Sequence, residues 1–227
     1  MSILDIREGF DGWVAAMGMG TLAEFMSEPV GELLDSGRNG RELRRVRATC
    51  QGQSRTFYLK RIGREPFLKL LQALLLGHRP HSGPCREWLM LVRLKEAGFE
   101  TMRPVAYGER RFLGWPVGAF LLVEEVAGTE VADFYSRCSC GERQRLVEEI
   151  GVYLGALHRR GFFQPVRLKD LFFNRGAGFG EDAFTFVLID RETSKPWPTR
   201  FSRSRCLQTV VRATRRTLRG RVCVWPQ

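Results

Sequence analysis

Three charged residues are the clearest candidates for chemistry in this chain. Lys60 ends the strand-like run TFYLK, Glu87 lies in the next helical segment, CREW, and Asp190 closes the apolar run FTFVLID. Phosphoryl transfer needs a cation on the phosphates, an acid that holds this cation, and a carboxylate that binds magnesium. The set therefore predicts a phosphotransferase that uses ATP and Mg²⁺, with Lys60 and Asp190 facing each other across a nucleotide-sized gap. Taken singly, Lys60 also fits a surface lysine and Glu87 a solvated acid at a helix start.

Periodicity in the sequence predicts the elements that must position these residues. In chain order they are strands at 44–50 and 55–61, helices at 66–77 and 85–98, two or three strands within 102–128, a helix at 141–161, and strands at 170–174 and 184–190. A β-rich part followed by a helical part predicts an α+β fold with two lobes. We expect a small β-rich N-terminal lobe over residues 1–126, in which 1–40 is less constrained, and a mainly helical C-terminal lobe over 127–227.

The predicted junction between the lobes supplies a further group of candidates. Glu124 and Glu125 end the apolar run AFLLVEE and are followed by Val126, where the hinge of a kinase would fall. Here backbone groups rather than side chains would contact an adenine ring. The glycine-rich stretch SGRNG, residues 36–40, precedes the first predicted strand of the hairpin and is placed as a phosphate cover would be. It lacks a full GxGxxG pattern and fits a plain turn equally well.

Positive charge is concentrated at the C-terminal end. Residues 191–227 hold ten Lys/Arg and one acid, a net charge of +9, whereas residues 1–190 hold 26 bases and 24 acids, a net charge of +2. Such a segment attracts anions. Its most basic run, VVRATRRTLRGRV at 210–222, has no interleaved aromatic residues like those of a stacking platform, and the segment has no zinc-finger pattern, which argues against nucleic acid as a partner. We expect the basic tail to bind an anionic membrane surface, with a solvated surface helix as the alternative.

Cysteine usage and hydropathy predict a cytoplasmic protein. Six cysteines in 227 residues are too sparse for a disulfide framework, and the pair Cys138–Cys140 lacks a second half-site at zinc spacing. The N-terminal residues have no apolar signal core, and no stretch reaches the roughly 18 apolar residues of a membrane span.

Several strings, taken in order, resemble a known family. FYLKR, CREW, LKEAGFETMRPVAYGE, FLLVEEVAGTE, LGALHRRGFF and LIDRE are similar to segments of the lipopolysaccharide core kinases, the inner-core heptose and Kdo kinases. The resemblance covers about residues 44–192. It implies a protein-kinase-like fold in which Lys60 binds phosphates, Glu87 orients Lys60 and Asp190 holds magnesium. It also implies a heptose or related sugar of the lipopolysaccharide core, or a lipid-linked sugar, as acceptor, at the cytoplasmic face of the inner membrane.

The chain departs from this family in the expected catalytic loop. After GFF the family has His, any residue, Asp, whereas this chain has Gln164, Pro165 and Val166. A polar residue that helps to bind the metal is replaced by Leu171. If the loop is reshaped, Asp170 would serve as the substitute base and Asn174 as a nucleotide and magnesium ligand. The alternative is a catalytically impaired pseudokinase that acts as a scaffold in lipopolysaccharide assembly.

Overall fold

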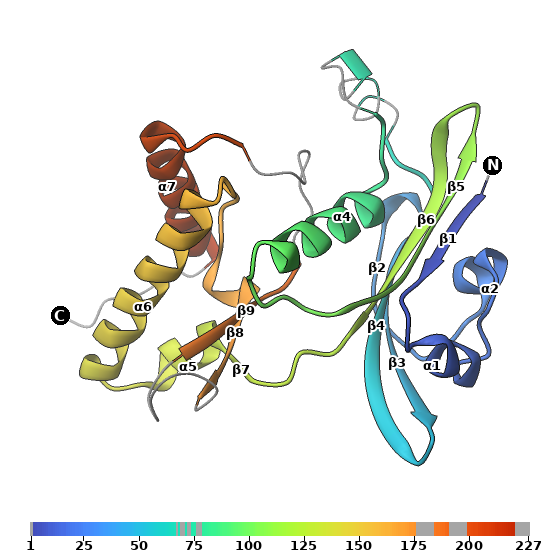
Figure 1. Cartoon of the computed structure of the whole chain (residues 1–227), viewed down its shortest axis with the longest axis horizontal. Coiled ribbons are helices and arrows are strands. Elements are labelled where there is room, and N and C mark those ends of the chain that lie inside the picture. Colours follow the sequence, from blue (N-terminus) through green and yellow to red (C-terminus); the bar gives the residue numbers. More distant parts are fainter. Residues whose placement is uncertain are drawn as a thin grey trace. The chain divides into compact units, whose positions relative to one another are not determined.

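The computed structural model describes residues 2–66, 79–175, 184–190 and 199–220, together with residues 68, 71, 74 and 75 (Figure 1). The chain forms two compact units. Unit 1 contains Met1–Val92 and Met102–Glu125, and unit 2 contains Arg93–Thr101, Val126–Asp190 and the described C-terminal residues. The helix predicted at 66–77 falls mostly outside the described residues.

Unit 1 is built on a six-stranded antiparallel sheet with strand order β1-β5-β6-β4-β3-β2. Its strands are β1 (Ser2–Ile6), β2 (Glu32–Gly37), β3 (Arg41–Cys50), β4 (Gln53–Ile62), β5 (Pro104–Phe112) and β6 (Trp115–Glu124). Its helices are α1 (Asp11–Ala16), α2 (Leu22–Ser27), the short 3₁₀ turn η1 (Arg38–Gly40) and the first part of α4 (Gly83–Glu96). The sheet therefore carries the predicted hairpin, and its strand β6 ends at Glu124, where the predicted hinge begins.

The hairpin of β3 and β4 is confirmed, and its turn explains its register. Gln51 and Gly52 both have positive φ, 51° and 76°, as a two-residue turn between antiparallel strands requires. Side chains alternate along β4, and Phe57 and Leu59 are fully buried on one face of the sheet. Lys60, the next residue, therefore points to the opposite face.

The N-terminal residues cover one face of this sheet. Phe25 of α2 stacks on Phe120 of β6 with ring centroids 4.0 Å apart, and Trp13 of α1 packs against Phe57. These side chains belong to one hydrophobic core with Leu59. Helix α4 lies on the other side of the sheet (Figure 1). The segment 1–40, less constrained by the sequence, thus completes the core and leaves the Lys60 face to α4.

Unit 2 combines a small sheet with the longest helices of the described chain. Its elements are β7 (Thr129–Glu130), α5 (Val131–Arg137), α6 (Cys140–Arg159), the 3₁₀ turn η2 (Leu168–Asp170), β8 (Leu171–Arg175), β9 (Phe184–Leu188) and α7 (Arg203–Gly220). A capping box of Ser139 and Glu142 starts α6, and Gly161 follows its end with φ 84°. The predicted helix at 141–161 is confirmed. No described helix is long and apolar enough to cross a membrane.

Candidate functional site

Lys60 and Glu87 form the ion pair that the sequence suggested. Lys60 Nζ lies 2.6 Å from Glu87 Oε1, and the Glu87 side chain is only 5% exposed. Lys60 comes from β4, where it pairs with Leu43 and Leu121, and Glu87 comes from the first half of α4. The pair holds the ammonium group at a fixed place on the sheet, with about a quarter of its side chain accessible to solvent.

Buried acids fasten the start of α4 to the sheet. The Ser82 backbone N–H and hydroxyl both donate to Glu109 Oε2, at 2.9 and 2.5 Å, and the Gly83 N–H donates to a Glu65 oxygen. The first N–H groups of a helix lack partners within the helix, and negative charge is favourable there. Glu109 is fully buried on β5 and also accepts from Arg111 Nε at 2.5 Å. The attachment fixes the turn that precedes Glu87.

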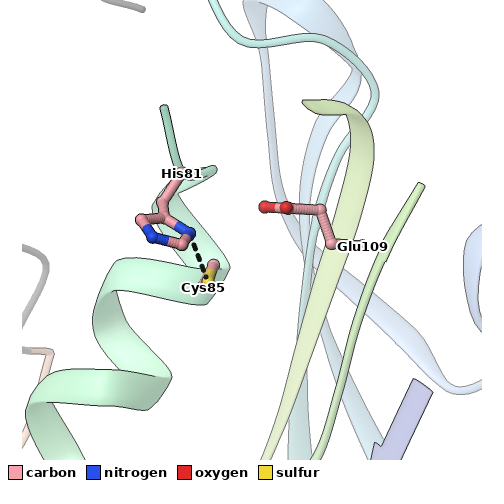
Figure 2. Close-up of side chains that lie close together, drawn as sticks. All are labelled: His81, Cys85 and Glu109. Carbon is pink, nitrogen blue, oxygen red and sulfur yellow. Dashed lines mark hydrogen bonds between the residues drawn. The ribbon is translucent and has the colours of Figure 1, made fainter. Parts of the chain in front are cut away.

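His81, Cys85 and Glu109 gather at the same place (Figure 2). One ligand atom from each lies within 4.8 Å of the others, and Cys85 Sγ is 3.2 Å from His81 Nδ1. These are residue types that bind zinc. However, Arg111 Nη2 lies 3.2 Å from the same Nδ1, so its guanidinium already supplies a positive charge between His81 and Glu109. Burial raises the pKa of Cys85 to about 11 and lowers the pKa of His81. The cluster is a satisfied structural network.

The side chains at the predicted hinge are engaged within unit 1. Glu124 pairs with Arg55 Nη1 at 2.9 Å, and Glu125 Oε1 accepts from the Tyr58 hydroxyl at 2.9 Å. Burial, followed by the hydrogen bond to Glu125, raises the pKa of Tyr58. Their carboxylates are therefore used within unit 1, and the backbone N–H groups of Glu124 and Glu125 donate to the Arg103 and Thr56 carbonyls, both at 2.9 Å. The contact of backbone groups with a nucleotide here stays a prediction. Val126 is the first residue of the next unit 2 segment, and its cofactor-binding role stays a prediction.

The stretch SGRNG forms the turn between β2 and β3. Asn39 and Gly40 have positive φ, 65° and 66°. The Asn39 carbonyl accepts from the backbone N–H groups of Gly63 and Arg64, both at 3.0 Å. This turn is thus tied to the end of the lysine strand.

The loop before β8 contains an internal ion pair. Arg167 Nε and Nη2 donate to both oxygens of Asp170 at 2.7–3.0 Å, and the Arg167 N–H donates to Oδ2 at 3.1 Å. Asp170 is only 3% exposed, and Val166, where the resemblance places the family's catalytic aspartate, is buried too. The structure therefore shows Asp170 holding Arg167, and its role as a base stays a prediction. Arg167 was not among the residues selected from the sequence, although its i,i+3 spacing to Asp170 was visible there.

Asp190 has the backbone and the exposure expected of a functional residue. Its φ is 53°, in the left-handed region that few residues other than glycine adopt. Such strained positions cluster at active sites. The Asp190 side chain is half exposed, and its Oδ2 lies 3.9 Å from Arg167 Nη2. The adjacent Ile189 N–H donates to the Asp170 carbonyl at 3.0 Å, which joins the two aspartate-bearing segments.

Asn174 does not lie with Asp190, which corrects its predicted role. Asn174 pairs with Thr185, whereas Leu188, two residues before Asp190, pairs with Leu171. The strand rise of about 3.3 Å per residue separates these pairs by about 10 Å. Magnesium ligands lie about 2 Å from the ion, so one ion does not reach both side chains. Instead, a Cβ at Gly128 would lie 2.6 Å from Asn174 Oδ1, so the Asn174 amide packs against the chain that follows the hinge.

Comparison with protein families agrees with this arrangement. Residues 27–219 match the model of the lipopolysaccharide kinase (Kdo/WaaP) family, which is most of the chain. The chain belongs to the lipopolysaccharide kinase (Kdo/WaaP) family. The resemblance noted in the sequence is therefore confirmed.

Two relatives of the family are similar over different lengths. The lipopolysaccharide core heptose(I) kinase WaaP of Pseudomonas aeruginosa is 34% identical over 100 residues, which cover 41% of this chain and 37% of that protein. A solved structure of WaaP in complex with acyl carrier protein matches with a TM-score of 0.58 and 23% identity, over 96% of this chain and 92% of that chain. The structural match confirms the predicted kinase-like α+β fold.

Proposed function

We propose that this protein transfers the γ-phosphoryl group of ATP to a sugar hydroxyl of the lipopolysaccharide core, on a heptose or a related sugar. The observation that carries the proposal is the ion pair of Lys60 and Glu87 within the family's fold. Lys60 would bind the phosphates, Glu87 would orient Lys60, and backbone groups of residues 124–126 would meet the adenine. In these roles the side chains position the substrates and stabilise charge, and they form no covalent bond to the substrate. Phosphoryl transfer is catalysed mainly in this way.

Asp190 is the residue that fits a magnesium ion. Its carboxylate is half exposed on a strained backbone, and carboxylate oxygens are preferred magnesium ligands. Magnesium commonly takes one or two protein carboxylates and completes its shell with phosphate oxygens and water. When bound, the metal neutralises charge on the phosphates. Asp190 would therefore hold the nucleotide through the ion without help from Asn174.

The absence of an acid at Val166 predicts slow turnover rather than none. A positioned base contributes about 10²–10⁴ in rate, whereas most of the catalysis of phosphoryl transfer comes from positioning and electrostatics. The alternative is a scaffold that binds nucleotide and does not turn over. It rests on Val166 alone, because the family and its relatives are kinases.

The test is a transfer assay on purified protein. Labelled ATP, Mg²⁺ and dephosphorylated core oligosaccharide are incubated with the wild type, the double variant Lys60→Ala/Asp190→Ala, and the control Glu96→Gln, which alters an exposed ion pair on α4. We expect label in the sugar with the wild type and the control only. Transfer equal to that of the double variant would defeat the proposal. A gain in stability with MgATP, about 2.7 kcal/mol at a hundredfold excess over Kd, without transfer would favour the scaffold.

We further propose that α7 rests on an anionic membrane surface. Leu207, Val210 and Val211 are 68%, 44% and 39% exposed on this helix. Thr209 is buried instead, and its hydroxyl donates to the Phe163 carbonyl at 3.2 Å, so another face of α7 packs on unit 2. Exposed apolar residues within a segment of net charge +9 favour binding in the interface plane.

Sedimentation with lipid vesicles tests the membrane proposal. Vesicles with anionic lipid should bind the wild type, and neutral vesicles should not. Leu207→Ser/Val211→Ser should weaken binding, whereas Val152→Ser, at an equally exposed apolar residue of α6, should not. Because WaaP was solved in complex with acyl carrier protein, this carrier is the alternative partner that the test includes. Binding of the carrier without binding of vesicles would overturn the membrane proposal.

A further inference from the structure

Arg167 occupies an unusual place for a surface arginine. It directly follows Val166, the position at which the resemblance to the family places the catalytic acid. Its guanidinium makes hydrogen bonds to both oxygens of the buried Asp170, and the shortest, from Nη2 to Oδ1, is 2.7 Å. Two parallel contacts to one carboxylate fix the plane of a guanidinium as well as its position. Arg167 is therefore held rigidly in the loop.

The Arg167 guanidinium lies between two carboxylates, those of Asp170 and Asp190. The same Nη2 atom that binds Asp170 lies 3.9 Å from Asp190 Oδ2. The Arg167 side chain is 31% exposed and the Asp190 side chain 50%, whereas that of Asp170 is 5% exposed. One edge of the guanidinium thus faces a buried acid, and the group remains partly open to solvent next to Asp190. The hydrogen bond to Asp170 raises the pKa of Arg167, so it stays charged at any physiological pH.

We propose that Arg167 is a catalytic residue that donates hydrogen bonds to the transferred phosphoryl group, with Asp170 as its positioning residue. The inference rests on the proposed function. In the step, a bond forms between the sugar oxygen and Pγ, and the bond between Pγ and the bridging oxygen of ADP breaks. The hydroxyl proton leaves to water, because Val166 accepts none. Negative charge on the phosphoryl oxygens is then met by a preorganised cation.

This role explains how a loop without a base remains useful. Arginines that contact the transferred group contribute about 10³–10⁵ in kcat in other phosphoryl-transfer enzymes, which is at least as much as a base contributes. Asp170 gains a function that agrees with its burial, since a carboxylate held by Arg167 positions that side chain. In this proposal the loop stabilises negative charge in the transition state instead of accepting a proton.

Steady-state kinetics and binding on full-length variants test the inference. Arg167→Gln should lower kcat by about 10²-fold or more and leave the Kd of MgATP, measured by calorimetry, within about threefold. Lys169→Gln, which removes an exposed cation two residues away, is the matched control and should leave both values unchanged. Added guanidinium should restore part of kcat in Arg167→Ala. A merely structural role would not give this rescue.

A second variant serves as a control for loss of folding. Arg167→Gln leaves Asp170 as a buried charge without its partner, which is strongly destabilising. Arg167→Gln/Asp170→Asn removes both charges and should show the same loss of kcat with a higher melting temperature. Wild-type kcat in either variant, while Lys60→Ala still abolishes transfer, would overturn the role of Arg167 and keep the proposed function. An increase in Kd with unchanged kcat would overturn it too. No transfer by the wild type would overturn both.

Discussion

Unit 1 and unit 2 differ in how closely they keep the chemistry of a kinase. Unit 1 has the lysine, its acid partner and a buried network that anchors the helix of that acid. Unit 2 keeps Asp190 and replaces the expected catalytic acid with Val166, beside a fixed Arg167. The residues proposed to bind phosphates form the ion pair that the resemblance implies, whereas the loop proposed to serve the acceptor is built around a cation.

The largest expected effect comes from a change in unit 1, which holds the ion pair of Lys60 and Glu87. Glu87→Gln removes the negative partner of Lys60, and a misplaced ammonium should lower kcat/KM for ATP by about 10²-fold. Initial rates of transfer at varied ATP measure the loss. Glu96→Gln on the same helix is the control and should match the wild type. Equal rates for Glu87→Gln and this control would show that the ion pair is irrelevant to nucleotide use.

Restoring an acid in the loop of unit 2 should raise kcat, by a smaller factor than the loss expected for unit 1. Val166→Asp places a carboxylate at the position of the family's base. We expect kcat to rise about tenfold, a fraction of the roughly 10²–10⁴ that an aligned base contributes. Val166→Asn has the same shape without the charge and should give no rise. An unchanged kcat in a folded Val166→Asp variant would mean that the loop no longer presents this position to the acceptor.

The network at the start of α4 should contribute mainly to the free energy of unfolding. Glu109→Gln leaves Arg111 without its buried partner and weakens the bonds from Ser82, so unfolding free energy should fall by about 3 kcal/mol. Urea unfolding measures the change. Glu32→Gln, which alters an exposed pair with Arg45 on the same sheet, should cost less than about 1 kcal/mol. Similar losses in both variants would contradict the anchoring role of Glu109.

The smallest expected effect is a dependence of stability on pH. Burial lowers the pKa of His81 and His158 in the folded protein, so the unfolded chain binds protons more readily. Their contribution is present above the ordinary histidine pKa of about 6.5 and is lost as the pH falls through the lower folded values. Melting temperatures between pH 7 and pH 5 should therefore drop, and His81→Gln/His158→Gln should flatten the curve. An equal slope in the variant would refute this origin.

Local sequence patterns were sufficient to predict many helices and strands and to select candidate functional residues. The hairpin of β3 and β4 follows from alternation around Gln51 and Gly52, and α6 follows from its periodic leucines and its stop at Gly161. Lys60 and Asp190 were selected because each closes an apolar run in the sequence, although β4 continues to Ile62 and β9 ends at Leu188. Asn174 was misplaced as a partner of Asp190, because four-residue spacing from Asp170 gives no information about which end of the β8–β9 hairpin carries which side chain.

The sequence by itself determined the family, the α+β order of elements and the pairing of Lys60 with Glu87. Only the tertiary structure decided that Asp170 faces Arg167 and that Glu109 reaches Ser82 at the start of α4. The physical reason is the range of the forces involved. Periodicity and turn geometry act within a few neighbouring residues. A buried carboxylate is held by whichever donor the packing of the sheet, helix or loop brings within about 3 Å.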